Sequence, residues 1–357
     1  MRIPHLNPKD NSITVAIVGC GGFIGSHLLK AVLQRTCWRV FAVDLESYRI
    51  QQHLADPRVE FYCGDLANPS VVQRIAQFPV VVNLAAICVP SRYMSEAATV
   101  IRSNYDHPAR LADACAKSGS WLIHFSTSEI YGKTAADSGL LEEDSADLVF
   151  GSVAASRWSY ATAKLLAERY MAGLTNLQWT VVRPFNFVGP YMDFMPGVDG
   201  EGIPRVLANF STALVRGEPI KLVNGGLARR TFTSVHDAID FIFCLFENPA
   251  AAKGQAFNVG NPDNEISIAE LARIMTEIYA DVKHIPVEEI PGAQIVDGVE
   301  YYGVGYEDSL RRMPSVEKAE RLVGFKASTP LREVLRESLT WFAEHYSTSD
   351  CLEKLAE

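Results

Sequence analysis

Two side chains that can exchange protons stand four residues apart in the segment RWSYATAK, namely Tyr160 and Lys164. Residues 157–173 have the pattern of a helix, so both side chains project from one of its faces. A Lys ammonium beside a phenol favours the phenolate and lowers the tyrosine pKa toward a value useful to a general base. The same spacing also arises by chance on many surface helices, so the pair indicates a catalytic function only together with a second motif.

A second polar group follows the apolar run WLIHF. Ser126, Thr127, Ser128 and Glu129 stand where this predicted strand ends, which is the edge where open parallel sheets bind ligands. Thr127 can hydrogen-bond a sugar hydroxyl, and Glu129, if partly desolvated, can carry a proton at neutral pH. The alternative is a polar strand end with a solvated Glu129. His124 alternates with core residues, and we expect a satisfied core histidine rather than a catalyst.

Three glycines with the spacing GxxGxxG follow the first predicted strand, at Gly19, Gly22 and Gly25. They open a helix whose N-terminal amides and dipole can hold a pyrophosphate, although such a triplet can also be a simple tight turn. Asp44 ends the second predicted strand, 19 residues after Gly25. A carboxylate there accepts the ribose hydroxyls of NAD and repels the 2′-phosphate of NADP. The sequence therefore predicts an NAD site, whose nicotinamide charge would further lower the pKa of Tyr160.

Asp65 and Leu66 follow the third predicted strand and can face the adenine of that cofactor. An Asp at this position can equally cap the next helix, and the sequence leaves the two interpretations open.

Basic side chains are spread through the second half of the chain. Each is individually consistent with a solvated surface residue, but a nucleoside diphosphate would require several of them to converge, because guanidinium groups and amides hold phosphates. They are Arg183, Arg205, Lys221, Arg229, Arg230, Arg311 and Arg312.

Short apolar runs alternate with helical stretches in the first half of the chain, which predicts parallel strands joined by right-handed helical crossovers. The strands are expected over 14–19, 39–44, 59–63, 80–85, 121–126 and 179–184, and the helices over 22–35, 99–118 and 157–173. The predicted fold class is therefore α/β: a Rossmann-type doubly wound parallel sheet with a smaller mixed α/β substrate-binding lobe.

The residue composition changes after Pro184. Gly and Pro cluster over 189–204, before a helix expected at about 203–217. We therefore expect an N-terminal tail over 1–12, an NAD-binding domain over 13–185 and a sugar-binding lobe over 186–357, some elements of which can return to the sheet. Ser267 and Glu270 form a capping box before a helix to about Tyr279, and Thr329 followed by Pro330 predicts an N-cap with proline at the first position of a C-terminal helix. Residues 286–312 read as a long, functional loop.

Composition narrows the possible functions of these 357 residues. Hydrophobic residues make up 48% and charged residues 21%, which is typical of a globular protein, and the net charge of −9 disfavours non-specific binding to nucleic acid. Seven cysteines without ligand-like spacing predict reduced thiols, with neither a disulfide framework nor a metal site. We find no export signal and no apolar run long enough to span a membrane.

The motifs together resemble a known family. GxxGxxG, NLAA (83–86), STSEIYG (126–132), YxxxK and RPFN (183–186) resemble the extended short-chain dehydrogenases that act on nucleotide sugars. Within that superfamily the chain is most similar to the UDP-apiose/UDP-xylose synthases and the UDP-glucuronate decarboxylases, through segments such as NLAAICVP, HFSTSEIYGKT, MDFMPGVDGEGIPRVL and YYGVGYEDSLRRMPS. The resemblance covers nearly the whole chain.

The resemblance implies roles for matching positions. Thr127, Tyr160 and Lys164 would serve hydride and proton transfer, Ser128 and Glu129 proton handling beside the sugar, and Arg312 the substrate carboxylate. The remaining implied cofactor positions are Gly19, Gly22, Phe23, Ile24, Gly25, Asp44, Asp65, Leu66, Leu84, Ala86 and Asn104. The implied UDP positions are Asn186, Arg205, Lys221, Arg230 and Tyr306.

Two positions depart from the family pattern. Ser128 stands where the plant apiose synthases carry Cys, although the partner thiol is kept as Cys88, and this puts the ring-contraction outcome in question. Tyr191 replaces the Arg of the usual GPRMD segment, which affects the contacts of that loop.

The resemblance implies NAD-dependent oxidation of UDP-glucuronate at C4 and its decarboxylation to a UDP-4-ketopentose, then UDP-apiose or UDP-xylose. The alternatives are an NAD-dependent UDP-glucuronate 4-epimerase, which the RRMPS context of Arg312 disfavours, and a non-catalytic NAD-binding regulator. Relatives commonly dimerise through the helices matching 99–118 and 157–173, so we expect a homodimer. The expected reduced thiols and the lack of an export signal favour the cytoplasm.

Overall fold

The computed structural model describes residues 6–133, 139–146, 148, 150–152, 155–304 and 306–346. The first five residues of the predicted tail and Cys351 lie outside the described residues.

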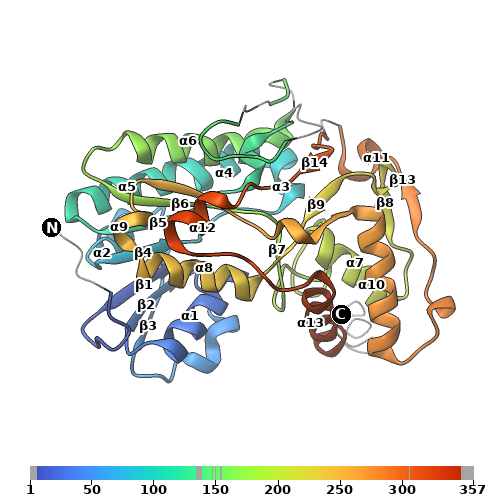
Figure 1. The fold of residues 1–357 in the computed structure, drawn as a ribbon, viewed down its shortest axis with the longest axis horizontal. Coiled ribbons are helices and arrows are strands. Elements are labelled where there is room, and N and C mark those ends of the chain that lie inside the picture. The colour runs from blue at the N-terminus through green and yellow to red at the C-terminus, as the bar shows by residue number, and fades with distance from the viewer. Residues whose placement is uncertain are drawn as a thin grey trace.

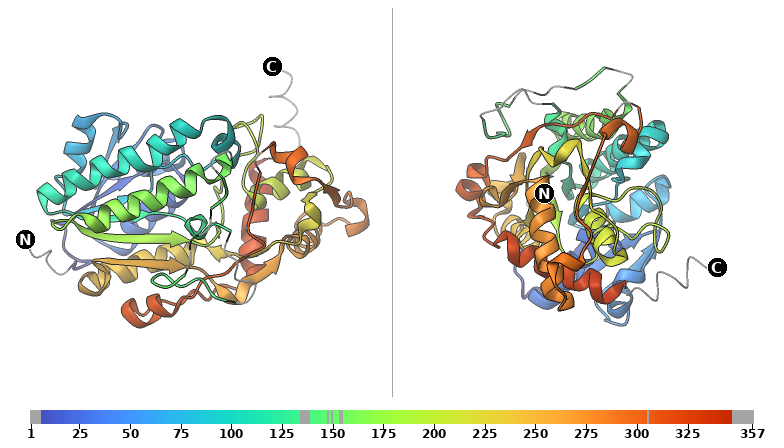
Figure 2. Two further views of the ribbon diagram at one scale, coloured as in Figure 1. Left: turned by 90° about the horizontal axis from the view of Figure 1, so that it is seen from above. Right: turned by 90° about the vertical axis from the view of Figure 1, so that its right-hand side faces the viewer.

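The larger half of the molecule is built on a seven-stranded sheet with the order β11-β6-β5-β4-β1-β2-β3 (Figures 1 and 2). Every neighbouring pair is parallel. The strands are β1 Thr14–Val18, β2 Arg39–Asp44, β3 Val59–Cys63, β4 Val80–Asn83, β5 Trp121–Phe125, β6 Gln178–Pro184 and β11 Gln255–Val259. The α/β fold class is confirmed, and the six predicted strands are all present. The seventh, β11, comes from the second half of the chain, so that half supplies part of the sheet.

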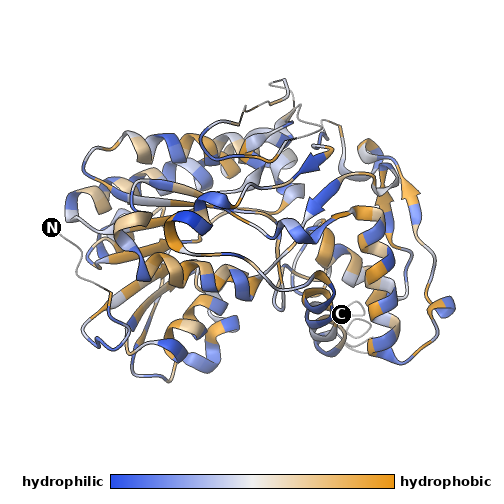
Figure 3. Cartoon of the chain, viewed as in Figure 1, coloured by the Kyte–Doolittle hydropathy of each residue, from blue (hydrophilic) through white to orange (hydrophobic). Residues whose placement is uncertain are grey.

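Helices cover both faces of the sheet, because successive strand residues point to opposite sides. Val15 and Ile17 of β1 belong to one buried cluster, with helices α1 Phe23–Arg35 and α8 Val235–Glu247. Ala16 and Val18 belong to another, with the helices of the opposite face, α2 Pro69–Ile75, α5 His107–Ser118 and α6 Ser159–Gly173. Figure 3 shows the strands of this sheet mostly in the colours of apolar residues. Burial on both faces explains why the strands read as continuous apolar runs.

The helix expected over 99–118 is interrupted. It consists of α4 Ala97–Ile101, a π-helical turn over Arg102–Asp106 and α5, with the His107 N–H donating to the carbonyl of Arg102. Pro108 explains the widened turn, since it has no N–H to give to the helix ladder. The helix expected over 157–173 begins as a 3₁₀ turn, η4 Ser156–Trp158, before α6.

The smaller lobe packs α7 Val206–Arg216, α10 Ile268–Lys283 and α13 Leu331–His345 together (Figure 1). Beside them lie two small sheets, one of β12 Glu265–Ser267, β9 Arg229–Thr231 and β14 Arg311–Arg312, the other of β13 Gln294–Val296 and β8 Lys221–Val223. β7 Phe187–Val188 and β10 Thr233–Ser234 form a further pair. The remaining helices are α3 Pro90–Ser95, α9 Pro249–Ala252, α11 Gly298–Tyr302 and α12 Glu317–Val323.

The capping predictions for this lobe had different outcomes. Ser267 caps α10, accepting a hydrogen bond from the Glu270 N–H, and the helix runs four residues beyond Tyr279. The prediction that Thr329 is an N-cap was wrong: Pro330 is the cap residue, because the Thr329 backbone N–H and hydroxyl both donate to Asp237 of α8. The predicted loop over 286–312 contains a 3₁₀ turn at Val287–Glu289, β13, α11 and β14, each too short to show a period of its own.

Candidate active site

A cavity of about 660 Å³ lies along the carboxyl edge of the sheet and follows the glycine turn after β1. The backbone there is too close for side chains: a Cβ at Gly25 would lie 2.0 Å from the Gly19 carbonyl oxygen, and one at Gly21 would lie 2.4 Å from the Glu46 carbonyl oxygen. Gly22 is the N-cap of α1 and provides no side-chain cap. The free amides of α1 therefore open onto this cavity, as a bound diphosphate requires.

Asp44 ends β2 against the same turn. Its carboxylate accepts hydrogen bonds from the Gly21 N–H at 2.8 Å and from the backbone of Leu45 at 2.7 Å. It lines the cavity together with the predicted cofactor positions Gly19, Gly22, Phe23, Ile24, Gly25, Asp65, Leu66, Leu84 and Ala86. The glycine cradle and a carboxylate held at the end of β2 fit a dinucleotide.

Asp65 and Asn104 are the two predicted cofactor positions whose local contacts differ from the expectation. Asn68, not Asp65, caps α2, so the helix-cap interpretation of Asp65 was wrong. Asn104 lies outside both cavity walls as the described residues define them: it is buried, and its amide donates to the carbonyls of Ile87 and Val100. Its side-chain oxygen Oδ1 is buried without a hydrogen-bond partner among the described residues, so its place at the cofactor stays a prediction.

Four basic side chains that the sequence analysis did not select also line the first cavity, namely Arg49, Arg92, Arg102 and His107. All four follow the glycine turn in the sequence, in separate segments, and no spacing rule joins them. The three arginines bring positive charge to the cavity that would hold a diphosphate.

A second cavity of about 290 Å³ adjoins the first. Cys88 and Arg205 line both. The wall of the second cavity contains every predicted catalytic and substrate position, that is, Cys88, Thr127, Ser128, Glu129, Tyr160, Lys164, Asn186, Arg205, Lys221, Arg230, Tyr306 and Arg312. The ends of β5 and β6, helix α6 and the smaller lobe thus meet around one space.

Tyr160 and Lys164 occupy the face of α6 that looks onto this space. The Tyr160 ring stacks on Tyr93 with centroids 4.7 Å apart, and its hydroxyl hydrogen-bonds Thr127. Lys164 Nζ donates to the Phe125 carbonyl at 2.8 Å. Burial raises the pKa of Tyr160, with Cys88 and Glu129 adding to the rise, and burial lowers the pKa of Lys164 to about 8. In the protein alone the phenol therefore stays protonated, and the expected lowering of its pKa requires added positive charge.

The expectation that Glu129 carries a proton at neutral pH was wrong. Arg157 donates to both carboxylate oxygens of Glu129, at 2.6 and 3.0 Å, and Arg312 Nη1 lies 3.7 Å away. Burial would raise the pKa of Glu129, but the two guanidinium groups lower it below its usual value. Glu129 is therefore an ionised partner of arginines.

Three arginines and two carboxylates form a cluster in the wall of this second cavity. Arg230 Nη2 contacts Asp308 at 2.8 Å, and Arg312 Nη2 lies 3.8 Å from the same carboxylate. The cations Arg157, Arg230 and Arg312 outnumber Glu129 and Asp308. Arg312 is buried, and its Nε has no hydrogen-bond partner among the described residues. The cluster can therefore take up one more anion.

Arg157 and Asp308 are functional candidates that the sequence analysis missed. Arg157 stands in the quoted segment RWSYATAK, three residues before Tyr160, and Asp308 stands four residues before Arg312. Their importance comes from their ion-pair partners Glu129 and Arg230, which are far away in the sequence. The signal that the sequence offered was that both residues stand close to motif residues.

The outer part of this cavity combines aromatic and polar side chains. Tyr302 and Tyr306 stack with centroids 4.6 Å apart, Lys221 lies over the Tyr301 ring, and Asn209 donates to the Tyr301 hydroxyl. Asn186 donates its amide to the Thr231 carbonyl, which fixes it at the end of β6. Rings, amides and a lysine together suit a base and its phosphates.

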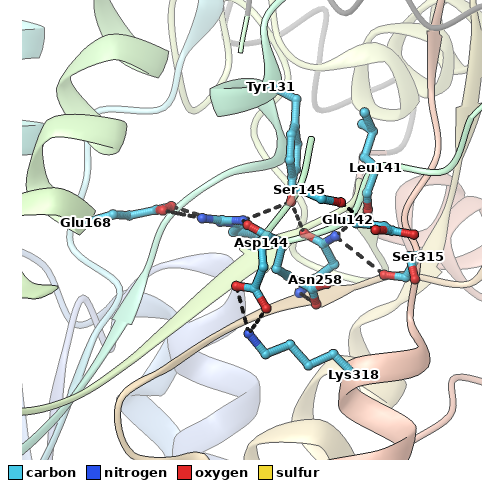
Figure 4. Close-up of polar contacts among 11 residues, drawn as sticks. Tyr131, Leu141, Glu142, Asp144, Ser145, Glu168, Asn258, Ser315 and Lys318 are labelled. Carbon is cyan, nitrogen blue, oxygen red and sulfur yellow. Dashed lines mark hydrogen bonds and ion pairs between the residues drawn. The ribbon is translucent and has the colours of Figure 1, made fainter. Parts of the chain in front are cut away.

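The other arginines serve the scaffold within the described part of the chain. Arg183 pairs with Glu168 of α6 and donates to the Tyr131 hydroxyl, behind the cavity wall. Figure 4 shows this buried network continuing through Asn258 of β11, and beside it the Lys318 and Asp144 pair. Arg229 and Arg311 share Glu265 at the far side of β9. The predicted convergence therefore involves Arg205, Lys221, Arg230 and Arg312 only.

Ser128 and Tyr191, the two departures from the family pattern, and the predicted core residue His124 have different surroundings. Ser128 is buried, lines this cavity with Cys88, and burial raises the pKa of the Cys88 thiol. Tyr191 has a φ of 66° and packs its ring against His27 and Trp341. His124 is buried and contacts Asn83, but its Nε2 has no partner within the described residues, so it is a core histidine with one unsatisfied nitrogen.

Two predicted absences concern the whole chain. Among the described residues no group of His, Cys, Asp and Glu side chains is arranged to hold a metal ion. No helix in the described ranges has both the length and the apolar character to cross a membrane.

The comparisons with known proteins agree with this site. The family model for the NAD dependent epimerase/dehydratase family matches residues 15–260. The chain is 41% identical to a UDP-D-apiose/UDP-D-xylose synthase of Oryza sativa subsp. japonica, covering 94% of this chain and 90% of that protein. It is 40% identical to UDP-D-apiose/UDP-D-xylose synthase 1 of Arabidopsis thaliana, covering 96% and 94%.

Among solved structures, the PbgP3 protein of Burkholderia pseudomallei superposes with a TM-score of 0.81 at 29% identity over 96% of this chain and 98% of that chain. The UDP-glucuronic acid 4-epimerase of Bacillus cereus superposes with a TM-score of 0.76 at 20% identity, covering 94% of this chain and all of the other, and so shows the common fold. The glycine cradle, the α6 pair and these matches lead to one conclusion: the chain belongs to the NAD-dependent epimerase/dehydratase family of enzymes and uses NAD.

Proposed function

We propose that this enzyme oxidises UDP-glucuronate at C4, removes its carboxyl group as carbon dioxide, and forms UDP-apiose, UDP-xylose or both. One observation carries the proposal beyond the family: the buried arginine cluster beside Tyr160 has one more cation than carboxylates and an unpartnered Arg312 Nε. A sugar carboxylate supplies the missing anion. The near full-length similarity to UDP-D-apiose/UDP-D-xylose synthases supports the same substrate.

The first proton transfer falls to Tyr160. Its oxygen, hydrogen-bonded to Thr127, takes the proton of the C4 hydroxyl. The positive charges of Arg205 and of the nicotinamide ring of bound NAD would favour the phenolate, and Lys164 lines the same cavity. When bound, NAD would accept the hydride from C4, and the NADH so formed would later give a hydride to a carbonyl. The residues that would hold it are the glycine cradle and Asp44.

The second step depends on the arginine cluster. Oxidation leaves a ketone at C4, β to the C5 carboxylate, so the carbon-carbon bond to carbon dioxide breaks as its electron pair moves into an enolate. Arg312 orients the leaving carboxylate, while Thr127 and Tyr160 stabilise the negative oxygen that forms. A proton returned to C5 then gives the UDP-4-ketopentose.

Incubation of the purified protein with UDP-glucuronate and NAD is the direct test. We expect release of carbon dioxide and a UDP-pentose, identified by NMR of the nucleotide sugars. Formation of UDP-galacturonate without carbon dioxide would instead establish the 4-epimerase, and failure to convert the substrate despite NAD binding would favour the regulator.

Asp44 gives a prediction about cofactor choice. NADP would place its 2′-phosphate beside this carboxylate, which is already fixed by backbone N–H groups. We expect NAD to bind at least about tenfold more tightly than NADP, equivalent to about 1.4 kcal/mol. Parallel titrations of the two cofactors measure this, and equal affinities would show that Asp44 does not meet the ribose.

Ser128 gives a prediction about products. Apiose requires carbon-carbon bond cleavage and ring contraction, whereas xylose requires reduction alone. A thiol, with a reference pKa of about 8.5, exchanges protons near neutral pH more readily than a serine hydroxyl. Cys88 with Ser128 should thus shuttle protons less well than two thiols, and we expect Ser128→Cys to raise the apiose fraction. NMR of the products decides it, and an unchanged ratio would refute the thiol-pair argument.

We also propose that the protein is a homodimer and is located in the cytoplasm. In each subunit, residues 13–185 would bind the cofactor and residues 186–357 would bind the UDP-sugar. Ile101 of α4 and Leu166 of α6 are 40% and 44% exposed, and their helices lie in the two segments expected to form the dimer interface. Sedimentation of the purified protein tests the dimer.

A further inference from the structure

A chain of polar contacts links the two cavities through the loop over 189–204. At its centre is Asp193, whose backbone is in the left-handed region with a φ of 56°. That conformation is uncommon for a residue other than glycine, and Asp and Asn are among those that tolerate it best. It lets Asp193 use its carboxylate and its carbonyl group on different partners.

The carboxylate of Asp193 pairs with Arg205, which lines the second cavity. It accepts hydrogen bonds from the Arg205 backbone N–H at 2.8 Å, from Nε at 3.0 Å and from Nη2 at 2.5 Å. The Asp193 side chain is only 11% exposed. Arg205 therefore has a fixed orientation at the start of α7, where it borders both cavities.

The carbonyl of Asp193 is bound from the side of the first cavity. Arg49 Nη2 donates to it at 2.9 Å, and Arg49 Nη1 donates to the Gly21 carbonyl at 3.3 Å. Gly21 in turn donates its N–H to Asp44. The contacts thus run from Asp44, beside the expected ribose, through Gly21 and Arg49 to Asp193 and Arg205.

We propose that Asp193 couples the two cavities, so that a nucleoside diphosphate bound in the second cavity tightens the binding of NAD in the first. An anion held by Arg205 fixes the Arg205–Asp193 pair and hence the loop, and the fixed carbonyl of Asp193 keeps Arg49 on the glycine turn. The inference rests on the proposed function for the presence of UDP in the second cavity. Because coupling between two sites is reciprocal, NAD must tighten the binding of UDP by the same factor.

The test measures NAD affinity by titration calorimetry with and without saturating UDP. UDP should lower the Kd of the wild-type protein for NAD by about fivefold or more. Asp193→Asn tolerates the same backbone conformation and keeps the carbonyl, but removes the charge that holds Arg205. In this variant we expect both ligands to bind while the effect of UDP on NAD falls below about twofold, on the same scale of coupling.

Asp199→Asn is the matched control. Asp199 stands in the same loop, but its carboxylate accepts hydrogen bonds from the Met195 N–H and the Tyr346 hydroxyl, and none from Arg49 or Arg205 is among the described contacts. This variant should keep the full effect. If wild-type protein binds UDP and its NAD affinity does not change, or if Asp193→Asn keeps the full effect, the coupling is refuted alone. If UDP does not bind at all, the proposed function fails as well.

Discussion

Tyr160→Phe should lower turnover of UDP-glucuronate by about 100-fold or more, the range expected when a general base is lost. The substitution keeps the ring that stacks on Tyr93 and removes only the oxygen that hydrogen-bonds Thr127. UDP binding should therefore persist. Because burial raises the pKa of this phenol, wild-type turnover should increase with pH as the phenolate forms, and the variant should lose that increase.

Tyr170→Phe is a suitable control for this experiment. Tyr170 lies on the same helix, but its hydroxyl donates to Asp113 outside both described cavity walls. We expect wild-type turnover and an unchanged pH profile in this variant. A Tyr160→Phe protein with most of its activity would remove the phenol from the mechanism.

The sequence predicted the strand ends and the site around them because both follow from local rules. Continuous apolar runs mark strands buried on two faces, and parallel strands bring their carboxyl ends to one edge. That is why Asp44, at the end of β2, and Thr127 and Glu129, which follow β5, could be assigned to ligands before their surroundings were known.

The sequence could not predict the ionisation of Glu129, because its charge depends on partners distant along the chain. Desolvation alone would raise the pKa of this carboxyl group, but Arg157 and Arg312 reverse the direction of the pKa change. Asn104 depends on context in the same way, because within the π-helical turn before Pro108 its amide donates to the backbone. Tertiary context decides the charge of Glu129 and the partners of Asn104.

Arg312→Ala should reduce release of carbon dioxide by about 100-fold, which corresponds to about 2.7 kcal/mol of lost transition-state stabilisation. Loss of a charge-assisted bond to the substrate carboxylate is the physical reason. The affinity for UDP alone should change by less than about threefold, since UDP carries no such carboxylate and leaves this bond unmade in either protein. The measurements are carbon dioxide release and a UDP titration.

The neighbouring residue provides the control for Arg312. Arg311 lies on the same short strand β14, but it pairs with Glu265 outside the cavity walls as described. Arg311→Ala should therefore release carbon dioxide at close to the wild-type rate. Arg312→Lys, which keeps a positive charge without the planar fork, should fall between wild type and Arg312→Ala, because a point charge attracts the carboxylate but does not orient it. Carbon dioxide release by Arg312→Ala at the wild-type rate would show that the carboxylate binds elsewhere, and Arg157 would then be the next arginine of the cluster to substitute.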